Sequence, residues 1–151
     1  MRSFVAALAL TALVACGGAD EAADMPEMAE DMAPAGPTLA DFDGTWDLVA
    51  TLEGTPDPVA VQIAGSAAGG WTMTLPDREP MAVETSLSGD SLVMEAGPYE
   101  SVVRDGVTVS VRNAVVMTDD GRMVGTLVAT YQTAEGEEVV PGTVAGARGG
   151  M

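Results

Sequence analysis

The only cysteine of this 151-residue chain, Cys16, ends a short apolar run near the N-terminus. One basic residue, Arg2, precedes the apolar run from Phe4 to Val14, and small Ala15 stands directly before the thiol. These are the parts of a secretory signal peptide, and the run is too short to cross a bilayer as a finished helix. A lone cysteine forms no intramolecular disulfide, so we expect the Cys16 thiol to be modified instead. The alternative, a buried free thiol, has no reason to occupy this place in the pattern.

The residues Leu13-Val14-Ala15-Cys16 resemble the lipobox of bacterial lipoproteins. In that family a signal peptidase cuts before the cysteine, which is then acylated. The resemblance implies a signal peptide over residues 1–15, lipidation of Cys16 and a protein of the cell envelope held to a membrane by its lipid. Gly17 replaces the aspartate that diverts some lipoproteins to the inner membrane. The implied location is therefore the outer membrane, facing the periplasm or the cell surface.

Composition removes several kinds of chemistry. The chain has no histidine, which excludes Ser-His-Asp and Cys-His relays and His-ligated zinc. Carboxylates are so frequent, 23 against six arginines and no lysine, that two neighbouring ones say little about catalysis. We expect no enzyme activity and no cofactor. The net charge of −17 argues against a nucleic-acid partner.

Three methionines, Met25, Met28 and Met32, stand among carboxylates and suggest a different function. Spaced thioethers of this kind resemble the methionine-rich segments with which some periplasmic proteins bind cuprous copper, and soft sulfur ligands do favour Cu(I). The histidine that usually accompanies them is missing, and Pro26 breaks a helix that would present them together. Copper handling is therefore the alternative hypothesis, and we otherwise expect no metal site.

Residues 16–40 form an acidic segment that lacks large aliphatic and aromatic residues until Leu39. Such a composition buries too little apolar surface to offset the entropy of ordering the chain. We expect a disordered tether between the lipid and a domain over residues 41–151.

Beyond the tether, apolar and polar residues alternate with the period of two that is typical of β-strands. Turn-forming Gly, Pro and Asp residues separate the alternating runs. The expected strands are residues 45–52, 59–64, 71–75, 81–87, 91–95, 99–104, 107–112, 123–133 and 139–148. Consecutive strands with tight connections favour an antiparallel up-and-down meander, and closure into a barrel removes its two edges. The sequence thus predicts an all-β fold with a small barrel of eight or nine strands.

The segment Phe42-Asp43-Gly44-Thr45-Trp46 resembles the Gly-x-Trp entry to the first strand of the lipocalin and calycin superfamily. In that superfamily the tryptophan plugs one end of the barrel and an arginine of the last strand covers its ring. The resemblance implies these barrel-closing roles for Trp46 and Arg148. A guanidinium stacked on an indole seals a barrel end without an unpaired buried charge. Avidin-like barrels also open with Gly-x-Trp, so the resemblance supports the architecture more than the family.

Four large side chains are candidates for lining a cavity inside such a barrel: Trp71, Met73, Tyr99 and Tyr131. Each serves equally well as core filling or at the barrel rim. Small residues alternate in the last two strands, where they make room for a ligand or let the sheet bend sharply. These residues are Gly125, Ala129, Gly142 and Gly146. The expected function is that of a binding or scaffold module, which holds a small apolar ligand or docks to another envelope protein.

Overall fold

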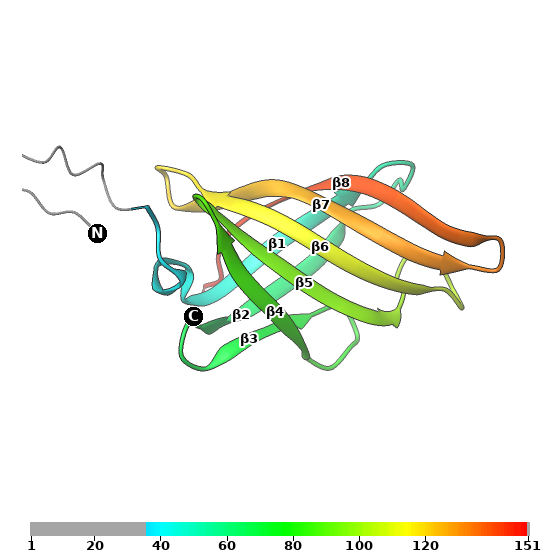
Figure 1. Ribbon diagram of the computed structural model, residues 1–151, viewed down its shortest axis with the longest axis horizontal. Coiled ribbons are helices and arrows are strands. Elements are labelled where there is room, and N and C mark those ends of the chain that lie inside the picture. The colour runs from blue at the N-terminus through cyan, green and yellow to red at the C-terminus, as the bar shows by residue number, and fades with distance from the viewer. Residues whose placement is uncertain (1–35, 151) are drawn as a thin grey trace, which may run out of the picture. The chain divides into compact units, whose positions relative to one another are not determined.

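The alternating runs form eight strands that pair in sequence order, and the structure, a computed structural model, describes residues 36–150 (Figure 1). A 3₁₀ helix, η1, precedes them over Leu39–Phe42. The strands are β1 (Gly44–Leu52), β2 (Val59–Ser66), β3 (Gly70–Thr74), β4 (Met81–Ser88), β5 (Ser91–Glu100), β6 (Thr108–Met117), β7 (Arg122–Thr133) and β8 (Gly136–Arg148). Every neighbouring pair is antiparallel, and β8 pairs with β1 to close the barrel. The predicted all-β up-and-down barrel is confirmed, with eight strands.

Side chains of one parity point into the barrel and make its core. On β1, Trp46, Leu48 and Leu52 are buried and Ala50 packs against the same core, whereas the alternate residues Asp47, Val49 and Thr51 face outward. The same alternation on the other strands adds buried side chains such as Ile63, Leu92 and Val115. Because successive strand residues point to opposite faces, this pattern fixes which residues can reach the interior.

The ninth strand expected over residues 99–104 does not exist, and that prediction was wrong. Tyr99 and Glu100 instead end β5, which pairs with β6 through a register shift between Ala96 and Tyr99. Pro98 has no amide hydrogen to continue the ladder, so the strand bulges there and then resumes. Residues 101–107 connect β5 to β6 without strand structure.

Residues just before position 41, the predicted start of the domain, also contact the barrel. Leu39 packs against the core, and the Asp41 carboxylate accepts hydrogen bonds from the backbone and the hydroxyl of Thr38, at 2.6 and 2.9 Å. These bonds cap η1, and the backbone bond in particular lowers the pKa of Asp41. The predicted signal peptide, the lipobox and residues 16–35 of the predicted tether lie outside the described residues.

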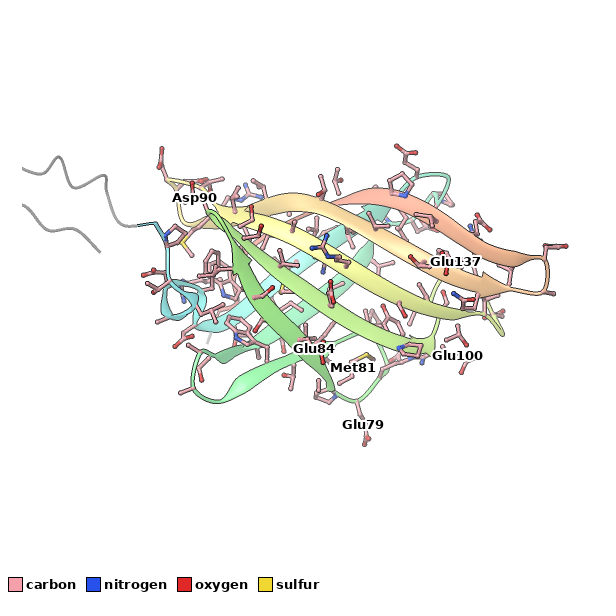
Figure 2. All side chains as sticks on the ribbon, in the orientation of Figure 1. Glu79, Met81, Glu84, Asp90, Glu100 and Glu137 are labelled. Carbon is pink, nitrogen blue, oxygen red and sulfur yellow. The ribbon has the colours of Figure 1, made fainter. Side chains whose placement is uncertain are left out.

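Acidic side chains such as Glu79, Glu84 and Glu137 point outward from the barrel wall and its loops (Figure 2). Within residues 36–150, no helix is long and apolar enough to cross a membrane. Over the same range, no group of three or more acidic or cysteine side chains is arranged to bind a metal ion.

Candidate functional site

One end of the barrel is plugged by Trp46, which has no exposed surface. Its indole Nε1 donates a hydrogen bond of 2.7 Å to the carbonyl oxygen of Phe42. The guanidinium carbon of Arg148 lies 4.5 Å from the centroid of the Trp46 ring. The guanidinium also donates to the carbonyl oxygens of Asp43 (2.6 Å) and Asp41 (3.1 Å). Arg148 thus connects the last strand to the entry turn and covers the plug, as a cation–π contact allows.

The structure explains why position 44, the first residue of the Gly-x-Trp entry, is a glycine. Its φ of +127° lies in a region that L side chains rarely adopt. A Cβ atom there would also lie 2.8 Å from Nη1 of Arg148. The glycine therefore lets the guanidinium reach the ring of Trp46, two residues along the chain.

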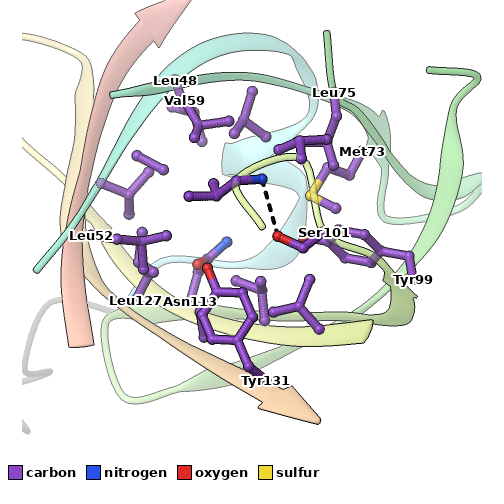
Figure 3. Close-up of a pocket in the computed structure, with 18 residues that line it drawn as sticks. Leu48, Leu52, Val59, Met73, Leu75, Tyr99, Ser101, Asn113, Leu127 and Tyr131 are labelled. Carbon is purple, nitrogen blue, oxygen red and sulfur yellow. Dashed lines mark hydrogen bonds between the residues drawn. The ribbon is translucent and has the colours of Figure 1, made fainter. Parts of the chain in front are cut away.

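A cavity of about 50 Å³ lies inside the barrel, away from the Trp46 plug (Figure 3). Most of its wall is aliphatic, from Leu48, Ala50, Leu52, Val59, Val61, Leu75, Val109, Val111, Leu127, Ala129 and Val144. Met73, Tyr99 and Tyr131, three of the four expected residues, also line it. Trp71 does not: it is buried in the core, and its Nε1 has no hydrogen-bond partner within the described part of the chain. An empty apolar cavity of roughly 150 Å³ holds benzene, so this one accommodates a group of a few atoms.

Asn113 interrupts the aliphatic wall. It follows Val109 and Val111 on the inward face of β6, and the residue is 8% exposed. The amide points into the cavity (Figure 3), and its Oδ1 has no hydrogen-bond partner among residues 36–150. An unpaired buried acceptor costs about 1–3 kcal/mol, so an amide here lowers stability relative to another valine.

Tyr99, on the cavity wall, remains uncharged at ordinary pH. Burial, followed by the proximity of Tyr131, raises the pKa of Tyr99 to about 12, against a smaller opposite effect of Arg78. No acidic or basic residue lines the cavity in the described range. The interior is therefore electrically neutral, with an amide and hydroxyl groups as its polar atoms.

The far end of the barrel is covered by residues 101–107, which we call the mouth loop. Its Val102 and Val103 line the cavity, and Val103 packs against the core. Ser101 holds the loop in shape, because its hydroxyl accepts hydrogen bonds of 3.0 Å from the backbone amides of Val103 and Arg104. Its own amide donates to the carbonyl oxygen of Val107 at 2.8 Å.

Arg104 fastens the mouth loop to the β7–β8 hairpin. Its guanidinium carbon lies 4.3 Å from the centroid of the Tyr131 ring. Its two terminal nitrogens donate to the two carboxylate oxygens of Glu138, at 2.6 and 2.9 Å. These hydrogen bonds lower the pKa of Glu138, so the ion pair persists at neutral pH and is lost as the pH falls through that lowered pKa. Because the pair is partly exposed, it fixes geometry more than it adds stability.

The small residues of β7 and β8 have different roles. Ala129 lines the cavity, but a Cβ on Gly125, Gly142 or Gly146 would run into the backbone of the neighbouring strand. These glycines therefore permit close approach of bent strands and do not widen the cavity.

Sequence reasoning missed Asn113, Arg104 and Glu138. A signal existed for Asn113, since the alternation of Val107, Val109 and Val111 continues through it. None existed for the pairing of Arg104 with Glu138, which are 34 residues apart. Of the other candidates, Cys16 and the three methionines Met25, Met28 and Met32 lie outside the described residues.

The comparisons with known proteins do not add a family. No family model matches the chain, and the searches of curated proteins and of solved structures find no match.

Proposed function

We propose that this protein is a non-enzymatic envelope lipoprotein whose barrel binds a small, largely apolar ligand. The observation that carries the proposal is the internal cavity, which is mainly aliphatic, has no charged residue on its wall and is bordered at the mouth by a short loop. Ligand sites are typically concave, mainly apolar and provided with a few polar groups that orient the ligand. Asn113 and the tyrosines supply such groups here. The unpaired amide is a further support, since a core under selection for stability alone favours a fully apolar wall.

Native mass spectrometry tests the binding. The protein purified from its own cells should retain a small compound that is released on denaturation. Ala129→Leu fills the cavity and should lose this mass, because Ala129 lies on the cavity wall. Val128→Leu, one residue earlier on the outer surface, should keep it. Identical apo masses for all three proteins, each folded by circular dichroism, would contradict the proposal.

The lipid anchor has a separate test. The substitution Cys16→Ser removes the thiol that the lipobox resemblance marks for acylation. Each buried CH₂ of an acyl chain contributes roughly 0.8 kcal/mol to membrane binding, so the variant should lose stable attachment. We expect it in the soluble fraction after cell breakage, whereas the unmodified protein should resist carbonate extraction. A variant that still sediments with membranes would show that Cys16 is not the anchor.

A further inference from the structure

The Asn113 amide and its surroundings constrain the chemistry of the ligand more closely than the shape of the barrel does. This inference rests on the proposed function and adds a chemical class to it. The amide offers one acceptor oxygen and two donor hydrogens. Because Oδ1 has no partner within residues 36–150, a bound molecule that donates a hydrogen bond would satisfy it.

The charge of the ligand follows from the wall. A carboxylate in the cavity would be desolvated with no cation beside it, since Arg104 is engaged with Glu138 and Tyr131 at the mouth. An ammonium group would likewise meet no carboxylate on the described wall. Both transfers are unfavourable, because an unpaired buried charge costs far more than a satisfied neutral dipole. The net charge of −17 further disfavours the approach of anions.

The position of Asn113 relative to the mouth suggests how such a ligand lies. The cavity of about 50 Å³ holds only a small group, and Val102 and Val103 of the mouth loop form part of its wall. A longer apolar body would therefore extend from Asn113 toward the mouth and displace these valines. The loop is short, has no strand structure and is attached to the β7–β8 hairpin through the partly exposed Arg104 side chain, so it is the part of the wall that yields most easily.

We propose that the cavity selects uncharged amphipathic molecules. A hydroxyl or amide group of the ligand donates a hydrogen bond to Asn113, and an apolar chain extends toward the mouth loop. A water molecule is the competing partner of the amide. A ligand group that replaces it must reproduce its hydrogen bonds, which a hydroxyl does and a hydrocarbon does not.

Three probes of equal chain length separate the possibilities: hexan-1-ol, hexanoate and hexylammonium. The protein is the predicted mature chain from residue 16 with Cys16→Ser, which is purified without detergent. Asn113 is the only asparagine in the chain, and Gln62 and Gln132 are the only glutamines. An NMR spectrum therefore contains side-chain amide signals from three residues, and those of Asn113 are readily assigned. Both glutamine side chains donate hydrogen bonds to carboxylates on the exposed surface, away from the cavity, and therefore serve as internal controls.

We expect hexan-1-ol to bind more tightly than either charged probe by at least about tenfold, because a buried unpaired charge is costly. We also expect it to shift the Asn113 amide signals while those of the two glutamines stay in place. One buried hydrogen bond to a neutral group corresponds to roughly a tenfold change in affinity at most. Asn113→Leu should therefore weaken hexan-1-ol binding by about tenfold. Val116→Leu is the matched control, because it also places a leucine on β6 but on the exposed face, away from the cavity wall, and leaves the amide intact. It should weaken binding by much less.

The possible failures are distinguishable. Hexanoate or hexylammonium binding as tightly as hexan-1-ol, or equal losses in the two leucine variants, would overturn the proposed ligand class while the binding function remains. Hexan-1-ol binding without movement of the Asn113 signals would do the same and would leave water as the partner of the amide. Failure of all three probes to bind would overturn the binding function itself, and this inference with it.

Discussion

Replacing Trp46 by alanine is expected to lower the free energy of unfolding by about 3–5 kcal/mol, the usual cost of removing a large aromatic side chain from a core. Trp46 is completely buried, and its indole also satisfies the Phe42 carbonyl. The loss would therefore combine a cavity at the plugged end with an unpaired acceptor. Urea unfolding followed by far-ultraviolet circular dichroism measures it without depending on tryptophan fluorescence.

A double-mutant cycle tests the contact between Trp46 and Arg148. Arg148→Ala alone should cost about 1–2 kcal/mol, through the lost cation–π contact and the lost packing of the arginine stem. Because each change breaks the same contact, the costs should sum to more than that of the double variant. Trp71 is the matched control, since it is also buried but lies on β3, which pairs with β2 and β4. Additive costs for Trp46 with Arg148, as expected for Trp71 with Arg148, would show that the stacking carries no energy.

Gly125→Ala is the second change with a large expected effect. A Cβ at this position would lie 2.7 Å from Cα of Val115 and closer still to the carbonyl oxygen of Ala114, both on β6. The strands would have to separate where β6 and β7 pair. Overpacking of this kind costs about 1–3 kcal/mol and more where backbone must move, so we expect about 3 kcal/mol in the same unfolding measurement.

Gly150→Ala is the control for Gly125→Ala. Nothing lies within 4 Å of a Cβ added at Gly150, so this variant should unfold like the unmodified protein. Equal stability of all three proteins would mean that β6 and β7 do not approach as closely as the structure places them.

The barrel was predictable because each strand buries one face, so apolar and polar residues alternate along the sequence with a period of two. The errors came where a polar or turn-forming residue interrupts that period without ending the strand. The strand predicted over residues 91–95 ends before Pro98, although β5 continues past that residue as a bulge. The strand predicted over residues 107–112 ends just before Asn113, which places a polar residue at an inward position. β6 in fact continues to Met117.

The candidate site was only partly predictable. Met73, Tyr99 and Tyr131 follow from alternation, but the size of the cavity depends on how side chains from all strands interdigitate. The attachment of Arg104 to Glu138 and Tyr131 depends on the path of a loop, for which the sequence has no periodic signal. The plug at Trp46 was accessible only through a resemblance, because alternation alone does not pair a tryptophan with an arginine 102 residues away (148 − 46).

The closure of the barrel by β1 and β8 also has a consequence for how the chain folds as it is made. Each of the other strand pairs joins neighbours in sequence, whereas the Arg148 bond to Asp43 spans 105 residues. Contacts between such distant segments form slowly, because the chain loses the entropy of closing a long loop before these contacts stabilise it. Until β8 has been synthesised, a growing chain exposes the free edges of β1 and β7, and exposed edges favour association with other chains. The nascent protein is therefore most vulnerable to aggregation just before its final strand is available.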